Sequence, residues 1–274
     1  MPRVWTNGAR GGLLVAPLLA WLDSDVPPAR RARQLAKANL RPGAVARLRC
    51  LLRGFPIPRW GNLRRSEPMS EYFGFERGTP VDRYYLHRFL DAHRGLITGK
   101  VLEIQMPGYT RTYGRAVSVA HSVDIDPSVS PRPTFVVDLA RAEDVIPDNT
   151  YDCFLLPNTL SVIEDIEGAL RNALRVVKPG GVVLATTAGF VPFTGREDDF
   201  WRMSAAGWRQ IAARVWPECE VQIEQHGNYL IAVGAMLGLA AEEFSQEELE
   251  AHHAKFPVAT TLFCRKPPGA HRME

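Results

Sequence analysis

The stretch that decides the fold is Val101-Leu102-Glu103-Ile104-Gln105-Met106-Pro107-Gly108-Tyr109. Its first four residues form the kind of largely apolar run that predicts a buried parallel strand, and Pro107 and Gly108 end that run. In α/β sheets, nucleotides bind where such a strand passes through a loop into a helix, because the helix offers unpaired backbone N–H groups there. We therefore expect a nucleotide-binding loop after residue 104.

Similar apolar runs recur on both sides of this stretch. They predict a helix over 82–90 and then strands over 117–125, 134–137, 152–156, 182–187, 220–224 and 259–264. Three-residue and four-residue spacing predicts helices over 163–177, 205–215 and 230–241, and Ser245 has the layout of a capped helix start. This alternation predicts an α/β fold, namely a doubly wound, Rossmann-like sheet of seven mostly parallel strands with helices on both faces.

Two carboxylates follow the second strand, in Ser122-Val123-Asp124-Ile125-Asp126-Pro127. A carboxylate at this place in a nucleotide-binding sheet can accept hydrogen bonds from both hydroxyl groups of a ribose. The alternation of an extended strand puts Asp124 and Asp126 on the same face, so both are candidates.

The charge of the chain is unevenly distributed. The net charge is +3, yet residues 1–66 carry 13 basic and 2 acidic side chains. We place a basic, Pro-rich and Arg-rich helical extension at 1–75, the core domain at 76–266 and a tail at 267–274. The extension could attract polyanions, and a solvated, partly helical arm is the plainer interpretation.

The composition is that of a folded protein, since 46% of the residues are hydrophobic and 23% are charged. The four cysteines are widely spaced, without a CxxC pair or a histidine at zinc-finger spacing. We therefore expect no metal and a reducing cytoplasmic location. The apolar runs are too short to predict a membrane span.

The strand and loop of residues 101–109 resemble those of class I S-adenosylmethionine-dependent methyltransferases, whose first strand typically reads V-L-E-I-G before a glycine-rich loop. Gln105 stands where the first glycine is expected, and Met106-Pro107 replaces more of that loop. The acid after the second strand, the Val137-Asp138-Leu139 string and the R-V-V-K-P-G-G run of residues 175–181 follow in the family's order. The resemblance covers residues 75–265. A closer likeness, carried by Phe73 to Tyr85, is to methyltransferases found beside bacterial glycosyltransferases.

The resemblance implies S-adenosylmethionine as the cofactor and a set of residues that hold it. Asp124 or Asp126 would bind the ribose, Asp138 would accept a hydrogen bond from the adenine amine, and Leu139 would lie against the adenine ring. The full set implied for the cofactor is Glu103, Gln105, Gly108, Tyr109, Asp124, Asp126, Asp138, Leu139 and Asn158.

The fold implies an acceptor site beyond the fourth and fifth strands, near Asn158, Thr159 and Phe190. The residues expected to bind the acceptor are Tyr84, Tyr85, Thr159, Trp201 and Arg202. For a general base, His226 is the histidine to test first, and a surface or capping role is its alternative.

Two functions follow from these residues. In the first, the protein methylates a small molecule, such as a sugar or another bacterial secondary metabolite, at oxygen or nitrogen. In the second, the altered Gln105-Met106-Pro107 loop has lost methyl transfer, and the fold acts as a cyclase or lyase or as a binding partner of another enzyme. Nucleic-acid methylation rests on the basic arm alone, so nucleic acid is not the expected partner, and a homo-oligomer stays open.

Overall fold

The structure is a computed structural model that describes residues 20, 23–39, 44, 50, 61–195 and 199–269. The chain divides into two compact units, residues 1–66 and 67–274. The first unit contains the Arg-rich helix α2 (Pro27–Asn39) and a 3-10 turn at Gly61–Leu63. The domain boundary at residue 76 stays a prediction.

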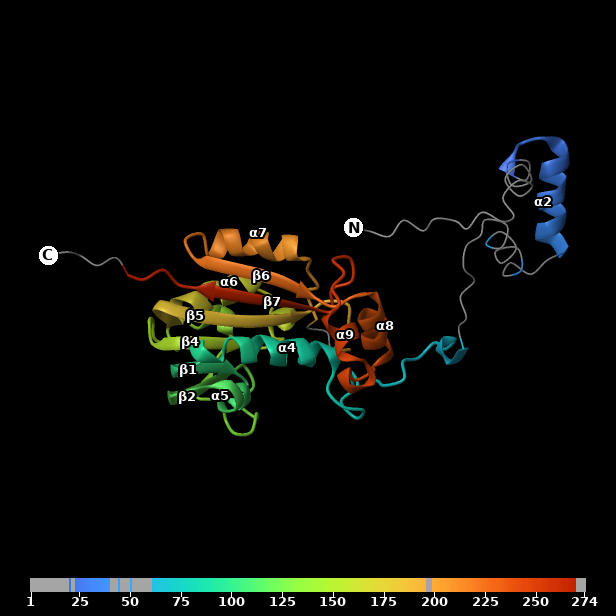
Figure 1. Cartoon of the computed structure of the whole chain (residues 1–274). Helices are drawn as coiled ribbons and strands as arrows, with labels where there is room; N and C mark the ends of the chain where they lie inside the picture. Colours follow the sequence, from blue (N-terminus) through green and yellow to red (C-terminus); the bar gives the residue numbers. More distant parts are fainter. Residues whose placement is uncertain are drawn as a thin grey trace. The chain divides into compact units, whose positions relative to one another are not determined.

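The second unit is built on seven strands in the order β3-β2-β1-β4-β5-β7-β6 (Figure 1). They are β1 (Gly99–Ile104), β2 (Val117–Asp124), β3 (Phe135–Val136), β4 (Tyr151–Leu156), β5 (Val177–Ala188), β6 (Glu220–His226) and β7 (Ala259–Arg265). The pairs among β1 to β5 are parallel, and β7 runs antiparallel to its neighbours β5 and β6. The predicted seven-stranded, mostly parallel sheet is confirmed.

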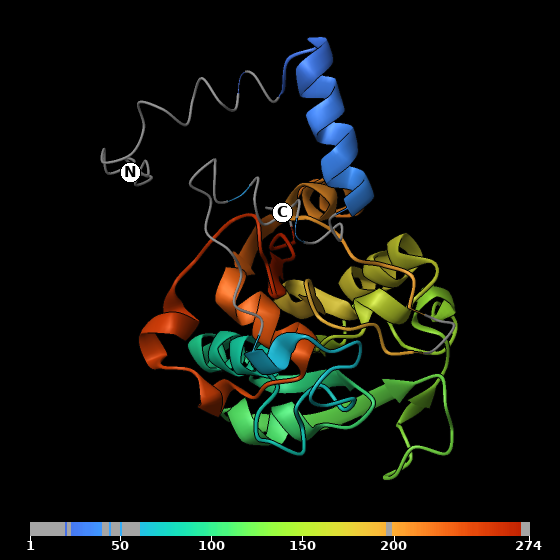
Figure 2. The ribbon, with the colours of Figure 1, turned by 90° about the vertical axis from the view of Figure 1, so that its right-hand side faces the viewer.

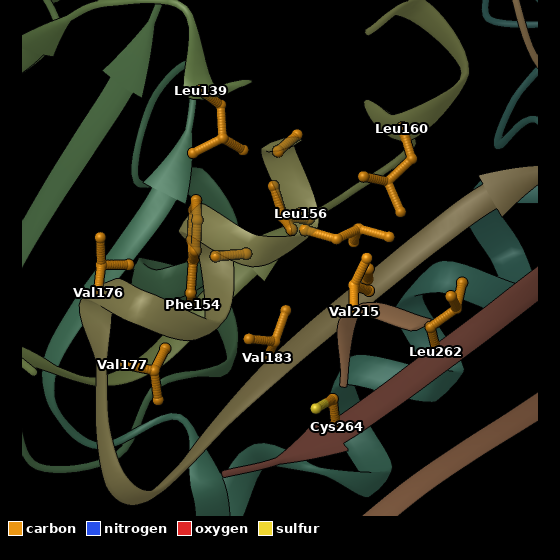
Figure 3. Packing of buried hydrophobic residues seen from close by; sticks show 14 of the residues in the cluster. Leu139, Phe154, Leu156, Leu160, Val176, Val177, Val183, Val215, Leu262 and Cys264 are labelled. Carbon is orange, nitrogen blue, oxygen red and sulfur yellow. The ribbon is translucent and has the colours of Figure 1, made fainter. Parts of the chain in front are cut away.

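Helices cover both faces of the sheet, as predicted. They are α4 (Val81–Ala92), α5 (Gly108–Tyr113), α6 (Ile166–Val176), α7 (Ala205–Val215), α8 (Tyr229–Leu237) and α9 (Gln246–Glu250), with 3-10 turns at Arg94–Leu96, Leu139–Arg141, Leu160–Val162 and Ala241–Glu243. Because strand side chains alternate, Phe154 and Leu156 pack under α6 and α7 (Figure 3), whereas Cys153 and Leu155 pack under α4. The sheet is therefore buried on both faces in its centre.

Two predicted helices have different ends in the structure. The helix expected from residue 163 begins at Ile166, because the Asp165 side chain accepts a hydrogen bond from the Gly168 N–H at 2.8 Å and caps the helix there. The helix expected to reach residue 241 ends at Leu237, because Gly238 takes a left-handed conformation with φ +74°.

The K-P-G-G run does not lie outside the sheet as a separate turn. Helix α6 ends at Val176, as the run predicts, but residues 178–181 lie within β5, where the β4–β5 register shifts between Tyr151 and Cys153. Gly180, with φ +80°, lies in this irregularity. Two other details concern later elements: the capping box at Ser245 is confirmed, and His226 is the last residue of β6 and not part of a turn.

Candidate functional site

The parallel strands end at one side of the sheet, which we call the carboxyl edge. It is formed by the segments that follow β1, β2, β4 and β5, and Figure 2 is turned so that this edge faces the viewer. In open α/β sheets, ligands bind outside the carboxyl ends of the strands. The first turn of α4 reaches the same edge, because the Asp82 carboxylate contacts Asn158, just beyond the end of β4.

The loop after β1 has the backbone path of a glycine loop, although it starts with glutamine. Gln105 has φ +67°, a left-handed conformation that glycine adopts readily and L-residues rarely adopt. Its N–H donates to the Val123 carbonyl at 2.9 Å, which fixes the loop to β2, and its side chain is exposed. The Gln105 side chain is thus accessible to solvent and is not packed into the core.

Replacing Gln105 with glycine is expected to raise the free energy of unfolding by about 1 kcal/mol, because the left-handed conformation costs an L-residue roughly 1–2 kcal/mol and glycine much less. Urea denaturation measures this change. The matched control is Gln222→Gly in β6, where glycine should lower stability by about 0.5–1 kcal/mol. Equal signs for the two variants would contradict the assigned backbone conformation.

Glu103 holds the start of α5 in place. It is 1% exposed, its Oε1 accepts from the Tyr109 N–H at 2.9 Å, and its Oε2 accepts from the N–H and the Oγ1 of Thr110 at 2.7 Å each. Burial raises the pKa of this carboxyl, while the hydrogen bonds from Thr110 act in the opposite direction. Glu103 thus supports the loop from behind, and a direct contact with a cofactor stays a prediction.

The two carboxylates after β2 lie in different surroundings. Asp124 is the last residue of β2 and is half-buried, and its Oδ1 accepts from the Asp126 N–H at 2.8 Å. Asp126 is exposed, and its Oδ1 accepts from the N–H and the Oγ of Ser128 at 2.8 and 2.6 Å. Both carboxylates accept hydrogen bonds in this turn, Asp124 from one donor and Asp126 from two, so Asp124 keeps more acceptor capacity, and its contact with a ribose stays a prediction.

Asp138 and Leu139 follow β3. The Asp138 Oδ1 accepts from the Ala140 N–H at 2.9 Å and caps the 3-10 turn at Leu139–Arg141. Leu139 is 4% exposed and packs with Phe154 and Leu156 in the core (Figure 3). Its side chain therefore serves packing in this structure, and its contact with an adenine ring stays a prediction.

A partly buried polar network joins α4 to the ends of β4 and β5. The Asn158 Nδ2 donates to the Asp82 Oδ2 at 2.6 Å, and the Thr186 Oγ1 donates to the Asn158 Oδ1 at 2.8 Å. Asn158 has a left-handed backbone with φ +48°, and its N–H donates to the Thr186 carbonyl at 2.9 Å. Asp82 and Thr186 were not predicted as site residues, although Asp82 lies within the stretch from Phe73 to Tyr85 that carries the closer likeness.

Arg83 connects the same turn of α4 to α5. Its guanidinium donates to the Tyr109 hydroxyl at 3.3 Å, and its Nε lies 3.9 Å from the Asp82 Oδ2. On the next turn of α4, the His87 Nδ1 lies 2.6 Å from the Tyr113 hydroxyl. Arg83 was also missed as a site residue, and its place beside Asp82 in the D-R-Y-Y string was the available signal.

Tyr84, Tyr85 and His226 are gathered at a different place, around a cavity of about 530 Å³ between α4, the end of β6 and α9. Tyr85 is 6% exposed, and its hydroxyl donates to the Leu249 carbonyl at 2.8 Å. The His226 ring stacks on Tyr85 with 5.6 Å between ring centres, and its Nε2 lies 2.9 Å from the Thr261 Oγ1. Burial raises the pKa of Tyr85 to about 12 and lowers the pKa of His226.

His226 is separated from the loop after β1 by more than half of the width of the sheet. Four strand spacings lie between β6 and β1, or about 19 Å. A general base must come within hydrogen-bond reach of the proton that it removes. The structure thus does not bring His226 together with Gln105 and Gly108, and its role as a base stays a prediction.

Thr159, Trp201 and Arg202 lie beyond β4 and β5 with their polar groups engaged. The Thr159 Oγ1 donates to the Pro157 carbonyl, and the Trp201 Nε1 donates to the Ile163 carbonyl at 2.8 Å. Arg202 makes a two-pronged ion pair with Asp199, whose side chain is only 4% exposed. These residues shape the segment after β5, and acceptor binding by them stays a prediction.

The groups at the carboxyl edge fit an adenine nucleoside that carries an amino acid. The described residues place no atom within 4 Å of the position that a Cβ on Gly108 would take, so a ligand can approach the backbone there. Asp124 offers a carboxylate for ribose hydroxyl groups, and Asp138 offers one for an amine. Among the described residues, no group of three or more His, Cys, Asp or Glu side chains is arranged to hold a metal ion. In the same part of the chain, no helix is long and apolar enough to cross a bilayer.

Comparison with known proteins gives one family match. Residues 108–185 match the family model described as a methyltransferase domain, a stretch that runs from the first residue of α5 into β5. The match covers less than half of the chain. The search among curated proteins gives no match.

Solved structures of several proteins are similar to this chain. A SAM-dependent methyltransferase from Archaeoglobus fulgidus has 15% identity and a TM-score of 0.48, with 72% of this chain and 100% of that chain covered. One from Thermotoga maritima has 17% identity and a TM-score of 0.47, with coverage of 70% and 94%. The cyclase SpnF has 18% identity and a TM-score of 0.46, with coverage of 70% and 85%.

The family match and the sheet describe the same part of the molecule. Residues 108–185 contain α5, β2, β3, β4, α6 and most of β5, and therefore most of the carboxyl edge. In the loop after β1, just before the matched stretch, Gln105 takes a left-handed conformation that glycine adopts readily. The match over residues 108–185 and the seven-stranded, mostly parallel sheet together indicate a Rossmann-like methyltransferase domain in this part of the chain.

Proposed function

We propose that the protein transfers a methyl group from S-adenosylmethionine to a small-molecule acceptor, a sugar or another secondary metabolite, at oxygen or nitrogen. The observation that carries the proposal is the glycine-like conformation of Gln105, with φ +67° and an exposed side chain. A loop with this path leaves room for a ligand in front of Gly108. The loss of the expected glycine therefore does not remove the site, and this weakens the alternative that the fold has become a cyclase, a lyase or a binding partner.

Two parts of the cofactor have counterparts among the residues of the carboxyl edge. We assign the ribose to Asp124 and the adenine amine to Asp138, while the Tyr109 and Thr110 N–H groups that open α5 are already bonded to Glu103. The cofactor supplies an activated methyl group on a sulfonium. The protein's part is to hold the acceptor in line with that group and to exclude water.

The acceptor is assigned to the segments after β4 and β5. Phe190 and Phe193 follow β5 and are 49% and 66% exposed, and Phe190 lies 6.4 Å from Phe256 between ring centres. Exposed aromatic side chains at a sheet edge suit an acceptor with a flat or ring-shaped body. Asn158 and Thr159 follow β4, and their side chains contact Asp82 and the Pro157 carbonyl.

Asp124→Ala is expected to weaken the binding of S-adenosylhomocysteine about 10- to 100-fold, because a carboxylate hydrogen-bonded to hydroxyl groups contributes roughly 1.5–3 kcal/mol. The matched control is Asp126→Ala, which should change the affinity by less than about threefold. Isothermal titration calorimetry measures both. A larger loss of affinity for Asp126→Ala than for Asp124→Ala would show that Asp126 binds the ribose.

Methyl transfer itself is tested with S-adenosylmethionine labelled in its methyl group and a panel of hydroxylated and amino sugars and aromatic metabolites. Incorporation of label into any small molecule supports the proposal. If the protein binds the cofactor and yet labels no member of a broad panel, the result favours the second hypothesis, in which the fold has lost methyl transfer.

The four cysteines are free, which suits a reducing compartment, and the cytoplasmic location stays a prediction.

A further inference from the structure

Two opposite charges stand side by side in the first turn of α4 without a hydrogen bond between them. The Asp82 Oδ2 and the Arg83 Nε are 3.9 Å apart, and the two side chains are 15% and 27% exposed. A charge that is largely removed from water requires a partner, since its solvation is lost. The contact between Asp82 and Arg83 therefore does not fully replace the solvation that the two charges have lost.

Asp82 is held in one position by neutral groups. Its Oδ2 accepts from the Asn158 Nδ2, and the Asn158 amide is oriented by the Thr186 hydroxyl on its other side. Burial raises the pKa of the Asp82 carboxyl, and the positive charge of Arg83 acts in the opposite direction. An additional cation at this carboxylate would stabilise its ionised form.

Arg83 is held at the other side of the same space. Among the described residues, its hydrogen bond is a single long one of 3.3 Å to the Tyr109 hydroxyl. A guanidinium has five N–H donors and is suited to bind a carboxylate with two of them at once. Tyr109 belongs to the first turn of α5, directly after the loop of Gln105 and Gly108.

The two charges thus lie between the end of β4 and the loop after β1, and each has capacity for a further polar contact. An α-amino acid carries an ammonium and a carboxylate on one carbon atom, so one such group can meet both side chains at once. We propose that Asp82 and Arg83 hold the amino-acid end of the cofactor, with Asp82 on the α-ammonium and Arg83 on the α-carboxylate. This proposal rests on the proposed function, because it assigns one end of that same cofactor.

The test compares two ligands that differ in this end alone. S-adenosylhomocysteine carries the amino acid, whereas 5′-deoxy-5′-methylthioadenosine has the same nucleoside and no amino acid. The full-length chain, Asp82→Asn and Arg83→Gln are titrated with each ligand in a calorimeter. The matched controls are Asp91→Asn and Arg94→Gln, which break a largely exposed ion pair between the last turn of α4 and the 3-10 turn that follows it.

We expect Asp82→Asn and Arg83→Gln to weaken S-adenosylhomocysteine binding by about 10- to 100-fold each. Both variants should bind the methylthio nucleoside within about threefold of the unchanged protein, and Arg83→Lys should recover part of the lost affinity. The two controls should bind both ligands as before. Melting temperatures identify any variant that is unfolded. If Arg83→Gln is unfolded, the binding of the two ligands is compared with Arg83→Lys and Asp82→Asn instead.

Two results would overturn the inference while leaving the proposed function intact. The first is unchanged S-adenosylhomocysteine binding by both variants, which would place the amino-acid end elsewhere. The second is an equal loss of both ligands, which would show that the two residues support the pocket as a whole. If the unchanged protein binds neither ligand, the proposed function itself fails, and this inference fails with it.

Discussion

Glu103→Ala lowers the free energy of unfolding by about 3–5 kcal/mol and abolishes cofactor binding, if the contacts of Glu103 have the role assigned to them. The carboxylate receives hydrogen bonds from the N–H groups of Tyr109 and Thr110 and from the Thr110 hydroxyl. Thr110 is 2% exposed, so its donors would find no water in place of the lost carboxylate. A buried donor without a partner costs about 1–3 kcal/mol, and the lost charge-assisted bonds add to that.

The measurement is urea denaturation of Glu103→Ala and Glu103→Gln, with calorimetric titration of S-adenosylhomocysteine. Glutamine keeps one acceptor oxygen, so its loss of stability should be smaller than that of alanine. The matched control is Glu247→Ala, an exposed glutamate in the first turn of α9, which should cost less than about 1 kcal/mol. Similar losses for Glu103→Ala and Glu247→Ala would show that Glu103 does not hold α5.

Asp199→Asn is the second large effect, with an expected loss of about 3–5 kcal/mol, because it leaves the Arg202 charge without its partner. The Asp199 side chain is 4% exposed and Arg202 is 19% exposed. Asp199 also accepts from the Thr194 N–H at 2.8 Å, and the Arg202 guanidinium lies 5.0 Å from the centre of the Phe193 ring. The pair therefore orders the segment that we assign to the acceptor.

Urea denaturation measures the loss, and limited proteolysis between residues 189 and 204 shows whether this segment opens first. The double variant Asp199→Asn/Arg202→Met should regain part of the stability, since it removes the unpaired charge. The exposed pair supplies the control, because Asp91→Asn should cost less than about 1 kcal/mol. No difference between Asp199→Asn and Asp91→Asn would contradict the buried ion pair.

The strands could be predicted closely because their signal is local. The apolar runs of β1, β2, β4 and β7 lie within two residues of the predicted bounds, since strand residues that are at least partly buried are rich in apolar and β-branched types. The helix ends were predicted less well. They depend on single contacts, such as the Asp165 cap of α6 and the left-handed Gly238 after α8.

The candidate site could be predicted only where it follows a strand directly. Asp124, Asp138 and Gly108 lie at strand ends or in the loops that follow, so their order along the chain reveals their common edge. The network of Asp82, Asn158 and Thr186 joins residues separated by 76 and 28 positions, and no local pattern shows such contacts. Those contacts exist only in the folded chain.

Residue identity is a weak guide to backbone conformation at Gln105, and periodicity alone is insufficient at Tyr85. Glutamine in place of glycine suggested a changed loop, yet its φ of +67° keeps the path, because neighbouring contacts outweigh the local preference of one residue. Tyr85 was expected to bind an acceptor, whereas it is 6% exposed and its hydroxyl is bonded to the Leu249 carbonyl. A helical face of aromatic residues does not reveal which of them the core uses.

The most direct test of the account is a calorimetric titration of the unchanged full-length protein with S-adenosylmethionine. The account predicts saturable binding to one site per chain, and Gln105→Gly should keep the affinity within about threefold because the backbone path is already that of glycine. Absence of binding at millimolar cofactor would contradict the account. The protein would then share the methyltransferase fold without binding the cofactor at the loop after β1.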